Sequence, residues 1–177
     1  SEFVVLKLLS GQWINDIQSL TSEPNTNYCV IANYLLDSMP IIAYAHGQQQ
    51  EVQLLAQRKN IQSSTFIGSP NQLTLRFSPL KNQQSHRYKH LCSRYTQHRF
   101  FTIPVMAIDF ITSYFSLGGN RLMIVNDKGY AHPDHLDYDE QFNLVVDGNY
   151  ASSVNFDAIM TATKDITHHD MVSIDNP

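Results

Sequence analysis

Residues 101–134 read FTIPVMAIDFITSYFSLGGNRLMIVNDKGYAHPD, and this stretch carries the strongest fold signals in the chain. The apolar run over residues 98–110 predicts a strand with an edge position or a bulge at Pro104, because proline cannot donate a ladder hydrogen bond. Residues 111–117 predict a short helix with a glycine stop. Residues 121–127 predict another strand, which ends in a turn at Asp-Lys-Gly.

The same strand signals continue on both sides of this stretch. NQLTLRFS, residues 71–78, alternates apolar and polar side chains and predicts a half-buried strand. QFNLVVDGNY, residues 141–150, predicts a further strand closed by an Asp-Gly pair. We therefore expect an antiparallel sheet in the second part of the chain.

The chain before residue 62 has a helical period instead. Three apolar segments, residues 4–20, 28–39 and 41–60, predict helices, and TSEPNTN at 21–27 separates the first from the second. Gly47 is a weak point in the third segment. The first segment has its apolar residues near one face of a helix of period 3.6. These residues are Val5, Leu8, Leu9, Trp13, Ile17 and Leu20.

These patterns predict an α+β fold in which long N-terminal helices pack on a central antiparallel sheet. The 177 residues suit one continuous domain, with a helical segment at 4–62 and a sheet module at 63–177. Residues 1–3 have the look of a cloning scar, so the sequence is expected to be a piece of a longer protein. No run of about 18 apolar residues occurs, so no membrane span is predicted.

Two short motifs resemble the Cache family of extracytoplasmic sensor domains, which have a PAS-like sheet behind a long N-terminal helix. They are Ala107-Ile108-Asp109-Phe110 and Val125-Asn126-Asp127-Lys128-Gly129-Tyr130-Ala131-His132-Pro133. The resemblance implies a non-enzymatic sensory domain of a transmembrane receptor: a chemoreceptor, a histidine kinase or a cyclic-dinucleotide enzyme. It also implies a periplasmic location in an inner-membrane protein, a small-molecule ligand, and a homodimer through the N-terminal helix.

In the amino-acid-binding branch of that family, an Asp at the end of the strand before the short helix pairs with the ligand amine. That role maps onto Asp109. The same branch has an Arg-x-Trp-Tyr motif, which this chain lacks because its only tryptophan is Trp13. The resemblance therefore supports the fold more strongly than an amino-acid ligand.

The residue pattern predicts a ligand site independently of the resemblance. In a strand over 98–110, Asp109 would share one face with apolar residues, and a buried carboxylate needs a partner. That partner is Arg94, Tyr95, Arg99, a backbone cap or a ligand cation; a cap on a helix beginning near Ile111 is the structural alternative. The candidate ligand-binding residues are Asp109, Arg94, Tyr95, Arg99, Phe101, Ile103, Val105, Tyr130 and His132.

Charge and histidine spacing argue against two other classes of site. The net charge is −4 and the basic residues are dispersed, so we expect no nucleic-acid partner. Three loose clusters have residue types that bind metals, but none has the spacing of a metalloprotease motif. They are His86/His90/Cys92, His132/His135/Asp137 and His168/His169/Asp170. We therefore predict no metal and no cofactor.

Two alternative functions stay open. Cys29 opens an apolar, helix-like run, as the nucleophile of a cysteine hydrolase does, and His132 and Asp137 follow in a suitable order. A partner-binding module without a small-molecule ligand would share the same fold. The two cysteines, Cys29 and Cys92, pair only if their Cα atoms lie within about 7 Å, which the sequence does not decide.

Overall fold

The structure is a computed structural model that describes residues 27–56, 73–117, 119–137, 142–144 and 150–167. It is a mixed α+β protein, as the sequence predicts. A four-stranded antiparallel sheet has the order β4-β3-β2-β5. Its strands are β2 (Ile42–Ala45), β3 (Gln48–Ala56), β4 (Leu73–Pro79) and β5 (Phe100–Ile103).

The other described strands form two-stranded pairs. β1 (Tyr28–Asn33) pairs in parallel with β6 (Arg121–Asn126), and β7 (Gly129–Tyr130) pairs in parallel with β10 (Val154–Asn155). β8 (Phe142–Leu144) and β9 (Tyr150–Ser152) form an antiparallel pair.

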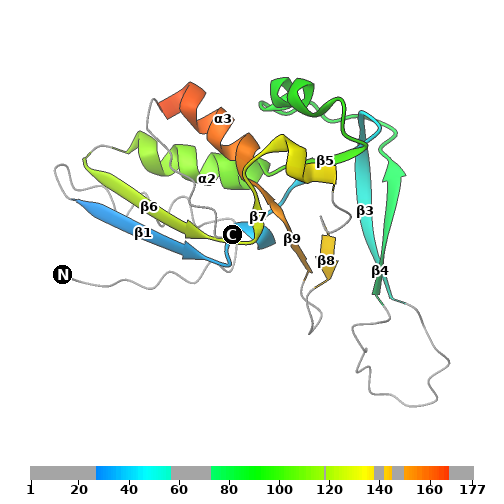
Figure 1. Ribbon diagram of the computed structural model, residues 1–177, viewed down its shortest axis with the longest axis horizontal. Coiled ribbons are helices and arrows are strands. Elements are labelled where there is room, and N and C mark those ends of the chain that lie inside the picture. The colour runs from blue at the N-terminus through cyan, green and yellow to red at the C-terminus, as the bar shows by residue number, and fades with distance from the viewer. Residues whose placement is uncertain (1–26, 57–72, 118, 138–141, 145–149, 168–177) are drawn as a thin grey trace, which may run out of the picture.

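Two α-helices, α2 (Val105–Ser116) and α3 (Phe156–Thr167), pack on each other. Figure 1 shows them side by side, with the β1–β6 pair along α2 and the β3–β4 hairpin extending away at the other end. The 3-10 helices are η1 (Leu36–Ser38), η3 (Lys89–Tyr95) and η4 (Pro133–Asp137). Fully buried side chains from β5, α2, α3 and η3 form the core. They include Leu91, Tyr95, Ile103, Ala107, Ile108, Ala158 and Ile159.

The helices predicted over 28–39 and 41–60 are wrong, because the described part of those ranges forms β1, η1, β2 and β3. His46 and Gly47 have φ angles of 50° and 74°, and Ala45 pairs with Gln48 across them. Two consecutive positive φ angles are characteristic of the type I′ turn of a two-residue hairpin. Gly47, expected as a weak point within a helix, therefore lies in the turn that connects β2 to β3.

The predicted strand over 98–110 is correct only to Ile103. Pro104 ends it, and its carbonyl accepts the Ile108 N–H at 3.0 Å, which is the first hydrogen bond of α2. The apolar residues beyond Pro104 are buried at helical spacing, at Ala107, Ile108, Ile111 and Tyr114. Asp109 therefore lies inside a helix; it neither ends a strand nor caps the helix.

Other parts of the sequence reading are confirmed. β4 overlaps the strand predicted at 71–78, β6 lies within that predicted at 121–127, and α2 ends at Ser116, before the glycine pair. The expectation that all these strands share one antiparallel sheet is wrong for β6, which pairs in parallel with β1. β8 begins the predicted strand at 141–150, of which only 142–144 and 150 are described. The helix predicted at 4–20 lies outside the described residues, and α3 was not predicted.

Gly129, the first residue of β7, has no room for a side chain. A Cβ atom there would meet the Val154 carbonyl oxygen and the Phe156 ring. The parallel β7–β10 pair thus brings its two backbones together at a position where only a hydrogen atom fits. The same contact holds the start of α3 close to β7.

Candidate functional site

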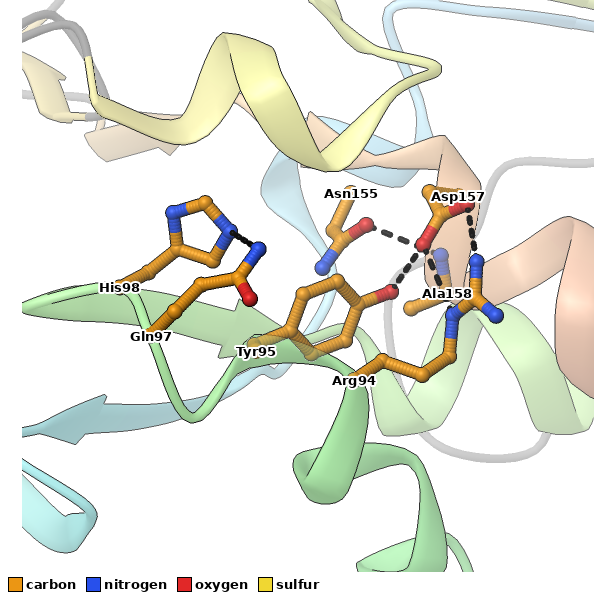
Figure 2. Close-up of polar contacts among 7 residues, drawn as sticks. All are labelled: Arg94, Tyr95, Gln97, His98, Asn155, Asp157 and Ala158. Carbon is orange, nitrogen blue, oxygen red and sulfur yellow. Dashed lines mark hydrogen bonds and ion pairs between the residues drawn. The ribbon is translucent and has the colours of Figure 1, made fainter.

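A network of charged and polar side chains lies where η3 meets the beginning of α3. We call Arg94, Tyr95, Asn155 and Asp157 the Asp157 cluster. Figure 2 shows Arg94 and Tyr95 pointing from η3 toward Asp157, with Asn155 just before it. Asn155 precedes α3, and Asp157 is in its first turn.

Asn155 determines how α3 begins. Its side-chain oxygen accepts the Ala158 N–H at 2.9 Å, which caps the helix. Its side-chain nitrogen donates to the Thr102 carbonyl at 2.8 Å, which ties the cap to β5. Because Asn155 is fully buried, both bonds form in a protected environment. The position of Asp157 relative to the sheet is therefore fixed.

Asp157 accepts hydrogen bonds from two side chains of η3. The Tyr95 hydroxyl donates at 2.6 Å, and Arg94 donates from Nε at 3.3 Å and from Nη2 at 3.0 Å. The Asp157 side chain is only 10% exposed, whereas that of Arg94 is 44% exposed. The positive end of the α3 dipole also favours a carboxylate in the first turn. The network joins a sheltered anion to a cation that solvent reaches.

The ionisation states of the two donors follow from these contacts. Burial, reinforced by the bond to Asp157, raises the pKa of the Tyr95 hydroxyl, so Tyr95 keeps its proton. The bond to Asp157 raises the pKa of the Arg94 guanidinium. Both groups therefore donate to the carboxylate at neutral pH.

Two buried hydroxyls border the cluster, from Thr102 on β5 and Tyr130 on β7. Burial raises the pKa of Tyr130, an effect that the neighbouring Thr102 opposes and the charge of Asp157 reinforces. Within the part of the chain that the structure describes, neither hydroxyl completes a well-formed hydrogen bond. Both side chains are buried, and they lie beside the charged Asp157.

The structure brings together several of the predicted ligand-binding residues. Arg94 and Tyr95 are in the cluster, Tyr130 borders it, and the Phe101 ring packs on Tyr95 with 5.3 Å between ring centroids. Ile103 is fully buried in the core.

Four predicted residues lie apart from the cluster contacts: Arg99, Val105, Asp109 and His132. Val105 is half-buried at the start of α2, and Arg99 is exposed, with its carbonyl accepting the His46 N–H. His132 is exposed, with its ring 5.8 Å from that of His135.

Asp109 lies on α2 and has its own partners in the two residues just before η3. Tyr88 donates to it at 2.6 Å, and Arg87 forms an ion pair with it at 3.1 Å. Burial, reinforced by Asp109, raises the pKa of Tyr88 to about 12. The partners of Asp109 are therefore Arg87 and Tyr88, which are not among the partners expected from the sequence.

The sequence reading missed Thr102, Asn155 and Asp157. A signal for two of them was present, because Asn155 precedes an apolar helical pattern as an N-cap and Asp157 follows in the first turn. No sequence signal marks the Thr102 hydroxyl, because its place beside the Asp157 cluster depends on β7 and α3 lying next to β5.

A second polar group surrounds Tyr44. Its hydroxyl contacts His86 Nε2 at 2.7 Å and accepts from Gln49 at 3.1 Å. Burial lowers the pKa of His86 and raises the pKa of the Cys92 thiol, so both neutral forms are favoured. Among the described residues, no group of three or more His, Cys, Asp or Glu side chains is placed to hold a metal.

The structure removes the main premise of the hydrolase alternative. Cys29 lies within β1, opposite Leu122 of β6, and not at the helix N-terminus that the hydrolase alternative requires. Cys29 is exposed, Cys92 is half-buried, and both thiols are free.

No protein-family model, curated protein or solved structure matches this chain. Within the described residues, no helix has both the length and the apolar character needed to cross a membrane.

Proposed function

We propose that this chain is a PAS-like, ligand-binding sensory domain of a transmembrane signalling receptor, with its ligand at the Asp157 cluster. Support comes from the Cache-like motifs in residues 107–110 and 125–133 and from the mixed α+β fold with its antiparallel sheet. The proposal includes a periplasmic location and a homodimer. The kind of output domain is left open.

The observation that carries the proposal is the unequal exposure of the Arg94–Asp157 pair. Asp157 is sheltered and held by Asn155 and α3, while Arg94 is 44% exposed and is free to change partner. A small molecule with an ionised acidic group competes with Asp157 for the guanidinium, which recognises planar anions through two parallel bonds. The hydroxyls of Thr102 and Tyr130 supply further polar contacts.

Such an exchange would connect ligand binding to a displacement. Arg94 lies on η3 and Asp157 on α3, so a ligand that takes Arg94 releases one contact between these elements. A ligand shifts an equilibrium only by the difference in its affinity for the two arrangements. The sensory output is therefore a change in the packing of η3 against α3.

A thermal-shift screen of small metabolites tests this proposal. A ligand at about 100 times its dissociation constant adds about 2.7 kcal/mol of stability, which raises the melting temperature by about 5–11 °C in a protein of this size. We expect the shift in the wild type and in Arg99→Gln, a matched loss of an exposed charge outside the cluster. We expect no shift in Arg94→Gln.

An equal response of Arg94→Gln and wild type would place the ligand elsewhere and refute the site. If no compound class shifts the wild type, the chain is not a small-molecule sensor and the partner-binding alternative takes its place. Turnover of a hit compound, followed by mass spectrometry, would instead show an enzyme.

A further inference from the structure

Polar side chains attach η3 to the rest of the protein at both of its ends. At its end, two side chains bind the Asp157 carboxylate of α3. At its beginning, the carbonyl of His86 accepts the Lys89 N–H at 3.1 Å. The His86 ring contacts the Tyr44 hydroxyl of β2 through Nε2 at 2.7 Å. The position of this ring therefore determines where η3 starts relative to the sheet.

The Tyr44 hydroxyl is a fixed partner for the His86 ring. Tyr44 is buried, and its ring stacks on Phe101 with 4.9 Å between the ring centroids. Gln49, which is also buried, donates to the Tyr44 hydroxyl at 3.1 Å and to the Gln84 carbonyl at 2.7 Å. Because these contacts hold the hydroxyl in place, the neutral ring has a hydrogen-bond partner at Nε2.

The same surroundings do not suit a protonated ring. Protonation makes both ring nitrogens of His86 donors, but Nδ1 is buried and has no hydrogen-bond partner within the part of the chain that the structure describes. Tyr44 of β2 and the Cys92 thiol of η3, which faces the Tyr44 hydroxyl, are neutral. Lys89 and His90 of η3 oppose a further positive charge. No carboxylate of the described residues forms an ion pair with the ring, so a proton here is an uncompensated charge.

We propose that His86 is a proton-operated attachment of η3: the neutral ring holds the beginning of η3 on β2, and the protonated ring releases it. The proton comes from water, and no other reactant is needed. The release moves the same element whose other end binds Asp157, and it requires no ligand at the Asp157 cluster.

The direction of the effect follows from the two environments of the ring. Burial, reinforced by Lys89 and His90, lowers the pKa of His86 in the attached state, whereas a histidine in water has a pKa of about 6.5. The released state therefore binds the proton more tightly. Attachment is complete above about pH 6.5 and weakens as the pH falls below it, by at most about tenfold per pH unit in the ratio of attached to released protein.

The two free cysteines supply a reporter and an internal reference. Cys92 lies on η3 and is half-buried, whereas Cys29 is exposed on β1. After brief labelling with dithiodipyridine and peptide mapping, we expect the ratio of Cys92 to Cys29 labelling to rise several-fold between about pH 8 and about pH 5. The ratio removes the general effect of pH on thiol reactivity. The comparison covers the pH range in which far-UV circular dichroism of the wild type is constant.

Two variants separate His86 from other titrating groups. His86→Gln keeps a hydrogen-bonding side chain that does not take up a proton, so its labelling ratio should not change with pH. His135→Gln removes an exposed histidine from η4 and should behave as the wild type does. A ratio that stays constant in the wild type would overturn the proposal, and so would an equal rise in His86→Gln.

A titration of the wild type by NMR keeps the test decisive if His86→Gln does not fold. The His86 ring should titrate with a midpoint below about pH 6.5. The Leu91 amide, which is bonded to the Tyr88 carbonyl at the start of η3, should shift with the same midpoint. A higher midpoint, or a Leu91 signal that does not follow the ring, would refute the release.

Discussion

The Tyr95 hydroxyl donates a 2.6 Å hydrogen bond to the Asp157 carboxylate, although 62 positions separate the two residues in the chain. The bond connects η3 to the first turn of α3 inside the molecule, where Tyr95 is fully buried. Because Arg94 is bound to the same carboxylate from the solvent side, Asp157 joins the core to the surface.

The contribution of this bond to stability can be measured with a matched pair of variants. Tyr95→Phe removes the hydroxyl and leaves Asp157 with Arg94 alone, so we expect a loss of about 1–2 kcal/mol in unfolding free energy. Tyr34→Phe removes a hydroxyl from a side chain that is 68% exposed and should change stability little. Urea denaturation of both variants tests the prediction, and equal losses would contradict it.

Asp109 gives a second prediction, because its structural partners are Tyr88 and Arg87. Asp109→Ala and Tyr88→Phe should each destabilise the protein. The double variant should lose less than the sum, with a coupling energy of about 0.5–1.5 kcal/mol. Additive losses in a double-mutant cycle would show that the 2.6 Å bond contributes nothing to stability.

The stability of the protein should fall in alkali. Burial raises the pKa of Tyr44 and of Tyr88 to about 12, whereas both ionise near 10 in the unfolded chain. The folded state therefore keeps protons that the unfolded state loses, and stability present below pH 10 is lost as the pH rises toward 12. Urea denaturation across this range should show a shallower decline in Tyr88→Phe than in the wild type, and an equally steep decline would contradict the prediction.

Gly129 provides a test of the β7–β10 contact. Gly129→Ala places a methyl group against the Val154 carbonyl and the Phe156 ring, so we expect a loss of about 1–3 kcal/mol. Gly47 is a suitable control, because a Cβ there meets nothing within 4 Å and asparagine tolerates its positive φ. Gly47→Asn should therefore be nearly neutral, and a larger loss at position 47 than at 129 would contradict the packing.

About half of the candidate site was foreseeable from the sequence. Arg94, Tyr95, Phe101 and Tyr130 were predicted ligand-binding residues and lie in or beside the Asp157 cluster. The sequence places Asp109 at the end of a strand. Alternation of apolar residues alone does not show that this strand stops at Pro104 and that a helix begins after it. Asp157 was missed because its partners on η3 are more than 60 positions away in the chain.

The sequence by itself determined the elements whose signals are local. The alternation in β4, the apolar run of β6 and the end of α2 before a glycine pair depend on neighbouring residues, and all three were predicted correctly. Only the tertiary structure decided the state of residues 28–56. Their apolar residues suit either a helix or a strand, and β1 becomes a strand because β6, more than 90 positions later, supplies its hydrogen-bond partners.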